Sequence, residues 1–277
     1  MSTANSAPIA CLTIGSSDSV GGAGIQGDIK AFASIGCYAA TVVVGVTAQN
    51  TIGVRTRCPI PLDVISDQLG AVLDDLPIRA IKVGTTWSVE VVELIGAALA
   101  AVEMPVVLDP VMVTAAGGWL SGDGDRIRRT VIDVLFPIAD VITPNLREAE
   151  LLAGSDPGKH NHRELAERLA RLGARSVVVS SSRDQPGDWF FDGNRHYVTA
   201  GMRHDVDADH GAGCAHSALL AGLLGRGVAM RDAVEIARDR AGAAVLFGLT
   251  HLGGGAHPVD TLGLAARYLD DTTDRTT

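Results

Sequence analysis

Short apolar runs alternate with longer helical patterns along most of this chain, and this alternation constrains its fold more than any other feature. The apolar runs predict strands at residues 9–14, 40–46, 80–83, 106–109, 141–143 and 176–180. The intervening segments predict helices at residues 24–35, 62–76, 89–101, 125–135, 145–153 and 163–172. Strands of this kind, separated by helices, indicate parallel βαβ units. We therefore expect an α/β fold, with a central, mostly parallel sheet and helices on both faces.

The remaining third of the chain has a different pattern. Residues 189–191 and 196–199 flank the turn-forming sequence Asp192-Gly193-Asn194, which predicts an antiparallel hairpin. Further helices are predicted at residues 215–224, 230–247 and 260–269. The sequence contains no repeat or low-complexity linker, so we expect a single domain over residues 1–277, with a frayed tail at 270–277.

Composition excludes several classes of protein. Of the 277 residues, 47% are hydrophobic and 20% charged, which is typical of a folded globular enzyme. The net charge of −9 argues against a nucleic-acid partner, which needs a basic face. We expect no membrane partner, because no apolar run is long enough to span a bilayer. A start without a basic region and four cysteines without CxxC spacing indicate a cytoplasmic protein with reduced thiols.

Polar or glycine-rich segments follow five of the predicted strands. In open α/β sheets, ligands bind beyond the carboxyl ends of the strands. We therefore expect one cleft, built from residues 15–18, 47–50, 84–86, 109–112 and 143–145.

The run His210-Gly211-Ala212-Gly213-Cys214 precedes an apolar helical pattern. Backbone N–H groups at such a turn and in the first turn of a helix can converge on an anion, such as a phosphate in transfer. Cys214 would then lie at a helix N-terminus, where a thiol pKa is typically lowered. It is a candidate general base or nucleophile. The alternative is a glycine-rich loop before an ordinary core helix.

A second glycine motif, residues 22–27, fits the dinucleotide fingerprint G-x-G-x-x-G. The motif begins eight residues after Ile14, too far for a tight first βα turn, and no acidic residue occurs between Asp28 and Asp63 to hold a ribose. An NAD(P) enzyme is therefore the minor alternative.

Five motifs together resemble those of hydroxymethylpyrimidine/phosphomethylpyrimidine kinases, members of the ribokinase-like superfamily. They occur in the family's order between about residues 9 and 225, at residues 12–30, 47–51, 108–113, 143–150 and 210–214. The resemblance implies a ribokinase-like fold and ATP-dependent phosphorylation of hydroxymethylpyrimidine, of its monophosphate, or of both, in the thiamin pyrimidine branch. It also implies ATP and Mg²⁺ as cofactors, a small-molecule substrate and a homodimer.

The resemblance assigns roles to the glycine-rich run and to the N-x-x-E motif. Gly211, Ala212 and Gly213 would form the anion hole for the transferred phosphoryl group, and Cys214 would accept the proton of the substrate hydroxyl. Asn145 and Glu148 share one face of a helix start. Asn145 would hold phosphates, and Glu148 would order Mg²⁺ through water; the alternative is capping of that helix. Asp109 would lie near the same metal, or it simply initiates a turn.

The resemblance also places the two substrates. Gln49 would read the edge of the pyrimidine ring, because an amide both donates and accepts hydrogen bonds. Asp28 would contact the ring amino group, or it is an early-helix acid favoured by the helix dipole. Four further residues are expected to bind the substrate: Ser16, Thr47, Thr85 and Val111. The nucleotide would contact Ser180, Arg183 and Asn145.

This sequence departs from the family pattern inside the expected cleft. Ser16 stands where the family has glycine, and Thr85-Thr86-Trp87 follow Gly84 where Met-Leu is usual. Residues 114–118 lack the expected lysine, and residues 180–183 read Ser-Ser-Ser-Arg in place of Lys-Gly-Gly-His. The acidic, histidine-rich residues 204–210 form a solvated approach to the anion hole or, less favoured, a metal site. Two alternatives therefore stay open: a kinase of a related heteroaromatic such as pyridoxal, and a non-catalytic pyrimidine- or nucleotide-binding descendant.

Overall fold

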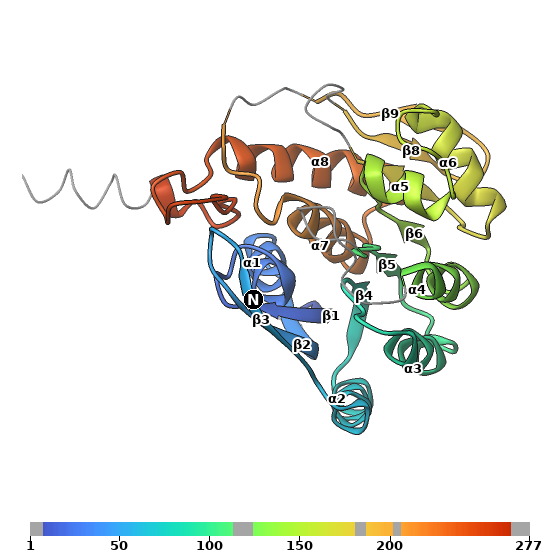
Figure 1. Cartoon of the computed structure of the whole chain (residues 1–277), viewed down its shortest axis with the longest axis horizontal. Helices are drawn as coiled ribbons and strands as arrows, with labels where there is room; N and C mark the ends of the chain where they lie inside the picture. The colour runs from blue at the N-terminus through green and yellow to red at the C-terminus, as the bar shows by residue number, and fades with distance from the viewer. Residues whose placement is uncertain (1–7, 113–123, 181–186, 202–205, 267–277) are drawn as a thin grey trace, which may run out of the picture.

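The computed structural model describes residues 8–112, 124–180, 187–201 and 206–266. These residues form a nine-stranded sheet in the order β3-β2-β1-β4-β5-β6-β7-β8-β9 (Figure 1). The six parallel strands are β1 (Ala10–Asp18), β2 (Tyr38–Gln49), β4 (Ile78–Val83), β5 (Val106–Leu108), β6 (Val141–Ile142) and β7 (Val177–Val179). The predicted α/β fold with a mostly parallel sheet is confirmed.

Antiparallel strands close both edges of the sheet. The predicted hairpin is present as β8 (Trp189–Phe191) and β9 (His196–Val198), with β8 paired to β7. At the other edge, β3 (Val54–Pro59) pairs with β2 and was not predicted. All six residues of β3 are exposed, so no face of this strand shows the apolar periodicity that reveals a half-buried strand.

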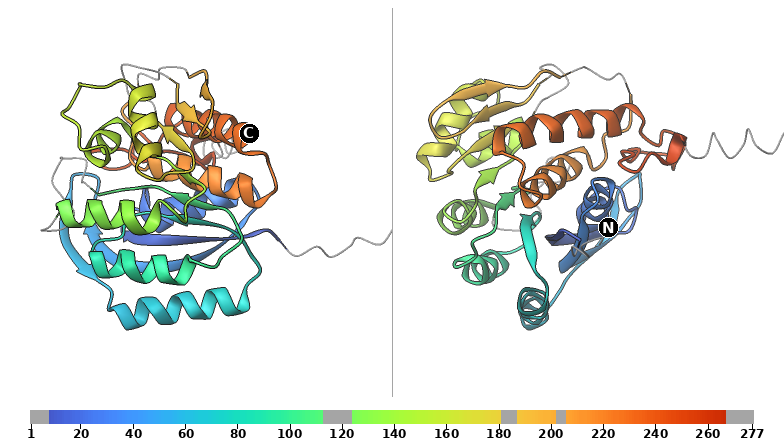
Figure 2. Two further views of the ribbon diagram at one scale, coloured as in Figure 1. Left: turned by 90° about the vertical axis from the view of Figure 1, so that its right-hand side faces the viewer. Right: turned by 180° about the vertical axis from the view of Figure 1, so that it is seen from behind.

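Helices cover both faces of the sheet (Figures 1 and 2). One face carries α2 (Leu62–Asp75), α3 (Val89–Leu99), α4 (Gly124–Thr130) with the π-helical turn η1 (Val131–Leu135), α5 (Leu146–Leu152) and α6 (His162–Arg171). The opposite face carries α1 (Gly24–Ser34), α7 (Ala212–Gly225) and α8 (Met230–Leu246). Because strand side chains alternate between the faces, Val177 and Val179 enter the first core while Val178 enters the second.

Three predicted boundaries are wrong. Strands β1 and β2 run to Asp18 and Gln49, so residues expected in loops after these strands belong to the strands themselves. The helix predicted from residue 260 begins only at 264, and residues 267–269 lie outside the described part. The Asp260 carboxylate accepts hydrogen bonds from the N–H groups of Leu262 (3.2 Å) and Ala265 (2.9 Å), and these bonds hold the preceding residues in a turn. Within the described residues, no helix is long and apolar enough to cross a membrane.

Candidate active site

A buried charged cluster lies where β1, β4 and β5 meet α1 and α7. We call its five residues, Thr13, Asp28, Lys82, Asp109 and Ser217, the cleft floor. Lys82 Nζ lies 2.7 and 2.9 Å from the two Asp28 oxygens and 3.6 Å from Asp109 Oδ2. Thr13 donates to Asp28 (2.5 Å), and Ser217 donates to Asp109 (2.8 Å). The floor therefore fixes one cation between two carboxylates.

Lys82 remains charged in this setting. Only 1% of the residue is exposed, and burial alone would lower the pKa of its ammonium group. The carboxylates of Asp28 and Asp109 and the nearby Cys214 outweigh burial and raise that pKa above its ordinary value. Sequence reasoning did not assign a role to Lys82, although a lysine within the otherwise apolar run of residues 80–83 was a signal. A buried charge needs a partner.

A second ion pair joins the end of β1 to the start of α7. His210 Nε2 lies 2.9 Å from Asp18 Oδ2, and Asp18 also accepts hydrogen bonds from the N–H groups of Val20 and Ala23. Burial raises the pKa of Asp18, but these hydrogen bonds outweigh it and hold the pKa below its usual value. We call Asp18, Gly22, His210 and Gly211 the cleft rim.

The glycine-rich run forms the expected helix N-terminus. Gly211 caps α7 with a φ of 89°, in the left-handed region that favours glycine. A Cβ at Gly211 would also overlap the carbonyl oxygen of Gly22, so the two glycine loops are packed together. The N–H of Ala212 donates to the Asp209 carbonyl (3.0 Å), whereas Gly213 is exposed in the first turn.

Cys214 lies in this first turn beside the cleft floor, but its predicted low pKa is wrong. Although the residue is partly exposed, burial of its thiol raises the pKa to about 12. Lys82 and the N–H of Gly24 act to lower it, while the carboxylates of Asp109 and Asp28 raise it further. The favourable field of the helix terminus is thus outweighed by desolvation and two neighbouring anions, and the thiol is neutral at pH 7.

Glu148 lies in the first turn of α5, and it forms with Asn145 the helix cap that was the alternative to a metal role. Its N–H donates to Asn145 Oδ1 (3.0 Å), while its carboxylate accepts from the N–H of Asn145 (2.9 Å). The residue is buried, with 5% exposed. Burial, followed by repulsion from Asp109, raises the pKa of Glu148 to about 8. The carboxylates of Glu148 and Asp109 therefore repel one another, and a bound cation would relieve this repulsion. Two carboxylates are a donor set that suits Mg²⁺.

The expected substrate residues lie at the carboxyl edge of the sheet. Ser16 and Thr47 are on the adjacent strands β1 and β2, and the Thr47 hydroxyl donates to the Ser17 carbonyl (2.9 Å) and approaches Gln49 Oε1 (3.5 Å). Thr85 follows β4, which pairs with β1 on its other side. Asp28 lies deeper, with 1% exposed, and its oxygens already accept from Thr13 and Lys82.

The expected nucleotide residues lie farther along the same edge. Ser180 follows β7 and forms an isolated parallel bridge with Asn145, which follows β6. Val111, which was expected to bind the substrate, lies between these two regions, beyond β5, where its N–H donates to the Asp109 carbonyl (2.8 Å). The residues 114–118 and Arg183 lie outside the described part of the chain.

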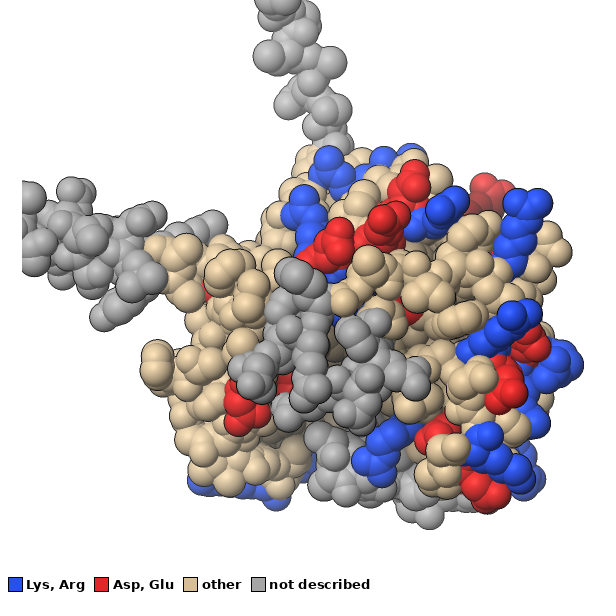
Figure 3. Space-filling model, turned by 90° about the horizontal axis from the view of Figure 1, so that it is seen from above, with Lys and Arg blue, Asp and Glu red and all other residues tan. Residues whose placement is uncertain are grey.

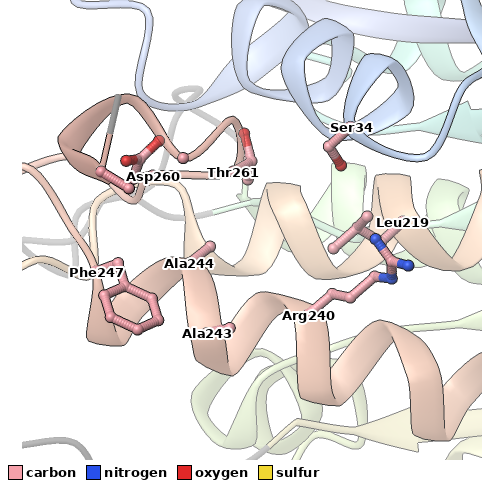
Figure 4. Close-up of a pocket in the computed structure, with 10 residues that line it drawn as sticks. Ser34, Leu219, Arg240, Ala243, Ala244, Phe247, Asp260 and Thr261 are labelled. Carbon is pink, nitrogen blue, oxygen red and sulfur yellow. The ribbon is translucent and has the colours of Figure 1, made fainter. Parts of the chain in front are cut away.

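A cavity of about 290 Å³ lies between α8, α1 and the segment from Asp260 (Figure 4), but it shares no residue with the cleft floor or rim. Asp260 and Arg240 are its charged lining residues, and Asp260 already caps a turn. On the face drawn in Figure 3, the coloured basic side chains are interspersed with acidic ones and form no continuous basic patch.

Comparison with known proteins agrees with this geometry. The sequence model of the family described as phosphomethylpyrimidine kinase matches residues 18–260. The chain is 37% identical to the hydroxymethylpyrimidine/phosphomethylpyrimidine kinase of Rhizobium meliloti, over 84% of this chain and 89% of that protein. It is 38% identical to the thiamine biosynthesis bifunctional protein ThiED of Geobacter sulfurreducens, matching 95% of this chain but only 54% of that longer protein.

A solved structure of the same fold also covers most of the chain. The pyridoxal kinase of Bacillus subtilis in complex with ADP superimposes with a TM-score of 0.85 and 31% identity, covering 93% of this chain and 99% of the other. The family match covers most of the chain, and its residues include the rim and all of the cleft floor except Thr13. By sequence and by fold, the chain belongs to the phosphomethylpyrimidine kinase family, within the ribokinase-like fold.

Proposed function

We propose that this protein is an ATP-dependent kinase that phosphorylates hydroxymethylpyrimidine, its monophosphate, or both. The observation that carries the proposal is the position of Cys214, in the first turn of α7 and within the electrostatic reach of Lys82 and Asp109. This arrangement puts a thiol, a helix N-terminus and a fixed cation around one point. Phosphoryl transfer depends mainly on such positioning and charge stabilisation.

In this proposal Gly211 to Gly213 surround the transferred phosphoryl group, with the exposed first turn at Gly213 as the principal donor region. The Lys82 ammonium stabilises negative charge on the same group, while Asp28 holds Lys82 in place. We therefore assign Asp28 a positioning role in addition to the predicted contact with the ring amino group. Gln49, Thr47, Thr85, Ser16 and Val111 line the side on which the acceptor binds.

Mg²⁺ would be held by Asp109 and Glu148, where it would neutralise phosphate charge. Occupation of this site has a consequence for Cys214. Asp109 raises the pKa of the Cys214 thiol, and a cation that neutralises Asp109 removes this contribution while the Lys82 field remains. Only when the metal and nucleotide are in place would the Cys214 thiol lose its proton to solvent more readily, and the resulting thiolate would accept the proton of the substrate hydroxyl. Ser180, Asn145 and Arg183 complete the proposed nucleotide side.

The solved relative at 31% identity is a pyridoxal kinase, which phosphorylates a different heteroaromatic acceptor. A pyridoxal-type acceptor is therefore the second candidate. We further propose a single kinase domain that works in the cytoplasm as a homodimer. The exposed apolar residues Val46, Ile52 and Val54 at the β2–β3 edge support self-association.

The test is acceptor-dependent release of ADP with saturating Mg²⁺, measured with hydroxymethylpyrimidine, its monophosphate and pyridoxal in parallel. We expect the pyrimidines to be preferred. Release that no acceptor changes would contradict a kinase and support the non-catalytic binding alternative.

Cys214→Ala distinguishes phosphorylation of the hydroxymethylpyrimidine hydroxyl from phosphorylation of the monophosphate. It should slow phosphorylation of the hydroxyl about 10²–10⁴-fold, as loss of a general base does, and slow phosphorylation of the monophosphate less. Cys58→Ala is the matched control, because Cys58 is an exposed thiol on β3. Equal losses in both steps would mean that Cys214 shapes the anion hole and does not transfer the proton.

A further inference from the structure

Two of the departures from the family pattern meet in space. Trp87, from the segment after β4, donates its indole N–H to the hydroxyl of Ser16 on β1. Ser16 occupies the position where glycine is usual, and Trp87 follows the two threonines that replace Met-Leu. A serine in place of glycine supplies the acceptor that a buried indole N–H requires. The two departures therefore form one structural unit.

A third residue makes room for this unit. The indole ring lies over Gly45 of β2, where an added Cβ would lie 2.7–2.9 Å from three of its ring carbons. Such a separation is too short for any side chain, so Gly45 is required for Trp87 to adopt this position. Ser16, Gly45 and Trp87 come from three different elements, and each constrains the other two. The ring also packs against the larger core and is partly buried, so it is held firmly.

The backbone at Trp87 is strained. Its φ of 65° makes it the non-glycine residue with a left-handed conformation among the described residues. The N–H of Ser88 donates to the Thr86 carbonyl (2.8 Å) across it, which closes a three-residue turn of a rare kind. Strain of this type costs free energy and persists where the surrounding structure enforces it, often at ligand sites. Here it directs the tryptophan across the ends of β1 and β2.

The indole borders the residues expected to read the acceptor. Side chains along a strand alternate, so Gly45, Thr47 and Gln49 share one face of β2. Trp87 lies on that face at Gly45, and Thr47 and Gln49 follow toward the carboxyl end. Thr47 pairs with Asp18 and Gly45 with Ser16 on β1. The aromatic ring therefore lies on the same face of β2 as the amide of Gln49, with Thr47 between them along the strand.

We propose that Trp87, held by Ser16 and Gly45, is a specificity-determining residue that forms an aromatic wall of the acceptor site and stacks on a flat heteroaromatic ring. This inference rests on the proposed function for its acceptor, but it assigns a residue outside the motifs on which that function is based. An aromatic side chain binds the face of a ring, while Gln49 binds its edge. Together they select a planar acceptor and disfavour a sugar of similar size.

The kinetic test compares variants with hydroxymethylpyrimidine as the acceptor. Trp87→Leu should raise the acceptor KM about 10- to 100-fold, the range for loss of one base–aromatic stack, and leave the ATP KM within about twofold. Trp87→Phe should restore most of the affinity, and Ser16→Ala should have an intermediate effect because the ring loses only its hydrogen bond. Trp189→Phe, on β8, is the matched control and should change nothing. An unchanged acceptor KM in Trp87→Leu, or an equal rise in the ATP KM, would overturn the proposal.

A binding measurement keeps the inference separate from the proposed reaction and from any failure of Trp87→Leu to fold. The chain has three tryptophans, so replacing Trp119 and Trp189 with phenylalanine leaves Trp87 as the sole indole fluorophore. Saturating hydroxymethylpyrimidine should quench its emission, and a nonaromatic polyol should not. Absence of quenching with a bound pyrimidine, established by calorimetry, would reject the wall, as would absence of any binding. If the single-tryptophan variant shows quenching but the wild-type protein shows no acceptor-dependent ADP release, the proposed reaction fails and the aromatic wall stands.

Discussion

The cleft floor and the cleft rim each contain an aspartate paired with a basic side chain, but the two pairs differ in what holds them. Lys82 and Asp28 have side chains that are 1% and 2% exposed, with further partners in Thr13 and Asp109. His210 and Asp18 have side chains that are 18% and 6% exposed, and the partner of the aspartate is an imidazole. The floor is thus a deeply buried charge arrangement with several partners, whereas the rim joins two loops through a single, more exposed pair. A pair of an aspartate with a basic side chain therefore fixes a charge in the floor and positions two loops in the rim.

The largest effect should follow removal of the floor cation. Lys82→Met leaves Asp28 and Asp109 buried without their shared partner, and breaking a buried pair in this way costs about 3–5 kcal/mol. Urea unfolding at pH 7 measures the loss. Lys159→Met is the control, because Lys159 and its partner Asp156 are 64% and 84% exposed, and its effect should be below about 0.5 kcal/mol. Similar losses in both variants would remove the distinction between the floor and an ordinary surface pair.

The next prediction concerns the carboxylate of Glu148, which is repelled by Asp109 of the cleft floor. The folded-state pKa of Glu148 is about 8, above the ordinary value of 4.5. The folded state therefore binds this proton more tightly, and stability falls as the pH rises from about 4.5 to 8. Glu148→Gln abolishes this cost and should stabilise the free protein by about 2–4 kcal/mol at pH 8, with a much smaller gain at pH 5.

Paired urea titrations at the two pH values measure this difference, and a gain independent of pH would contradict the assigned cause. Activity should change in the opposite direction. The variant should lose about 10- to 100-fold in turnover or in Mg²⁺ affinity, the range for a carboxylate that supports a metal through its bound water.

The rim should give the smallest effect on stability. Asp18→Asn weakens the charge-assisted hydrogen bonds to His210, Val20 and Ala23, and should cost about 1.5–3 kcal/mol at pH 7. Because the folded-state pKa of Asp18 is lowered, its contribution is complete above the unfolded value of about 3.9 and is lost as the pH falls through the folded value. The difference between the variant and the wild type should therefore shrink in acid. Thermal unfolding between pH 3 and 7 tests this, and a constant difference would show that Asp18 acts by packing alone.

The sequence was sufficient to predict the fold because both faces of the parallel strands are buried, which leaves uninterrupted apolar runs such as residues 106–108 and 177–179. It could not reveal β3, whose six exposed residues carry no periodicity. In the site, local motifs correctly predicted that Cys214 and Glu148 lie in the first turns of helices. The pKa of Cys214 was predicted in the wrong direction because its sign depends on Asp28 and Asp109, distant residues whose approach only the fold determines.

The same limit explains the partners that were missed. Lys82 and Asp28 are 54 positions apart, and His210 and Asp18 are 192 apart. Ser16 and Trp87 were each recognised as departures from the family, but nothing in the sequence shows that one accepts a hydrogen bond from the other. Pairing across such separations depends on strand order.

The unequal strand lengths have a consequence for local opening of the native state. Strands β1 and β2 have nine and twelve residues, whereas β5, β6 and β7 have three, two and three. Backbone amides of β1 and β2, up to the residues proposed to border the acceptor, are held in long ladders that open only with much of the sheet. Those at the ends of β6 and β7 are held by few bonds and open at lower free energy. Amide hydrogen exchange should therefore be slow at the proposed acceptor end of the sheet and fast at the proposed nucleotide end. A ligand bound beside β6 and β7 would then order more of the backbone than one bound beside β1 and β2.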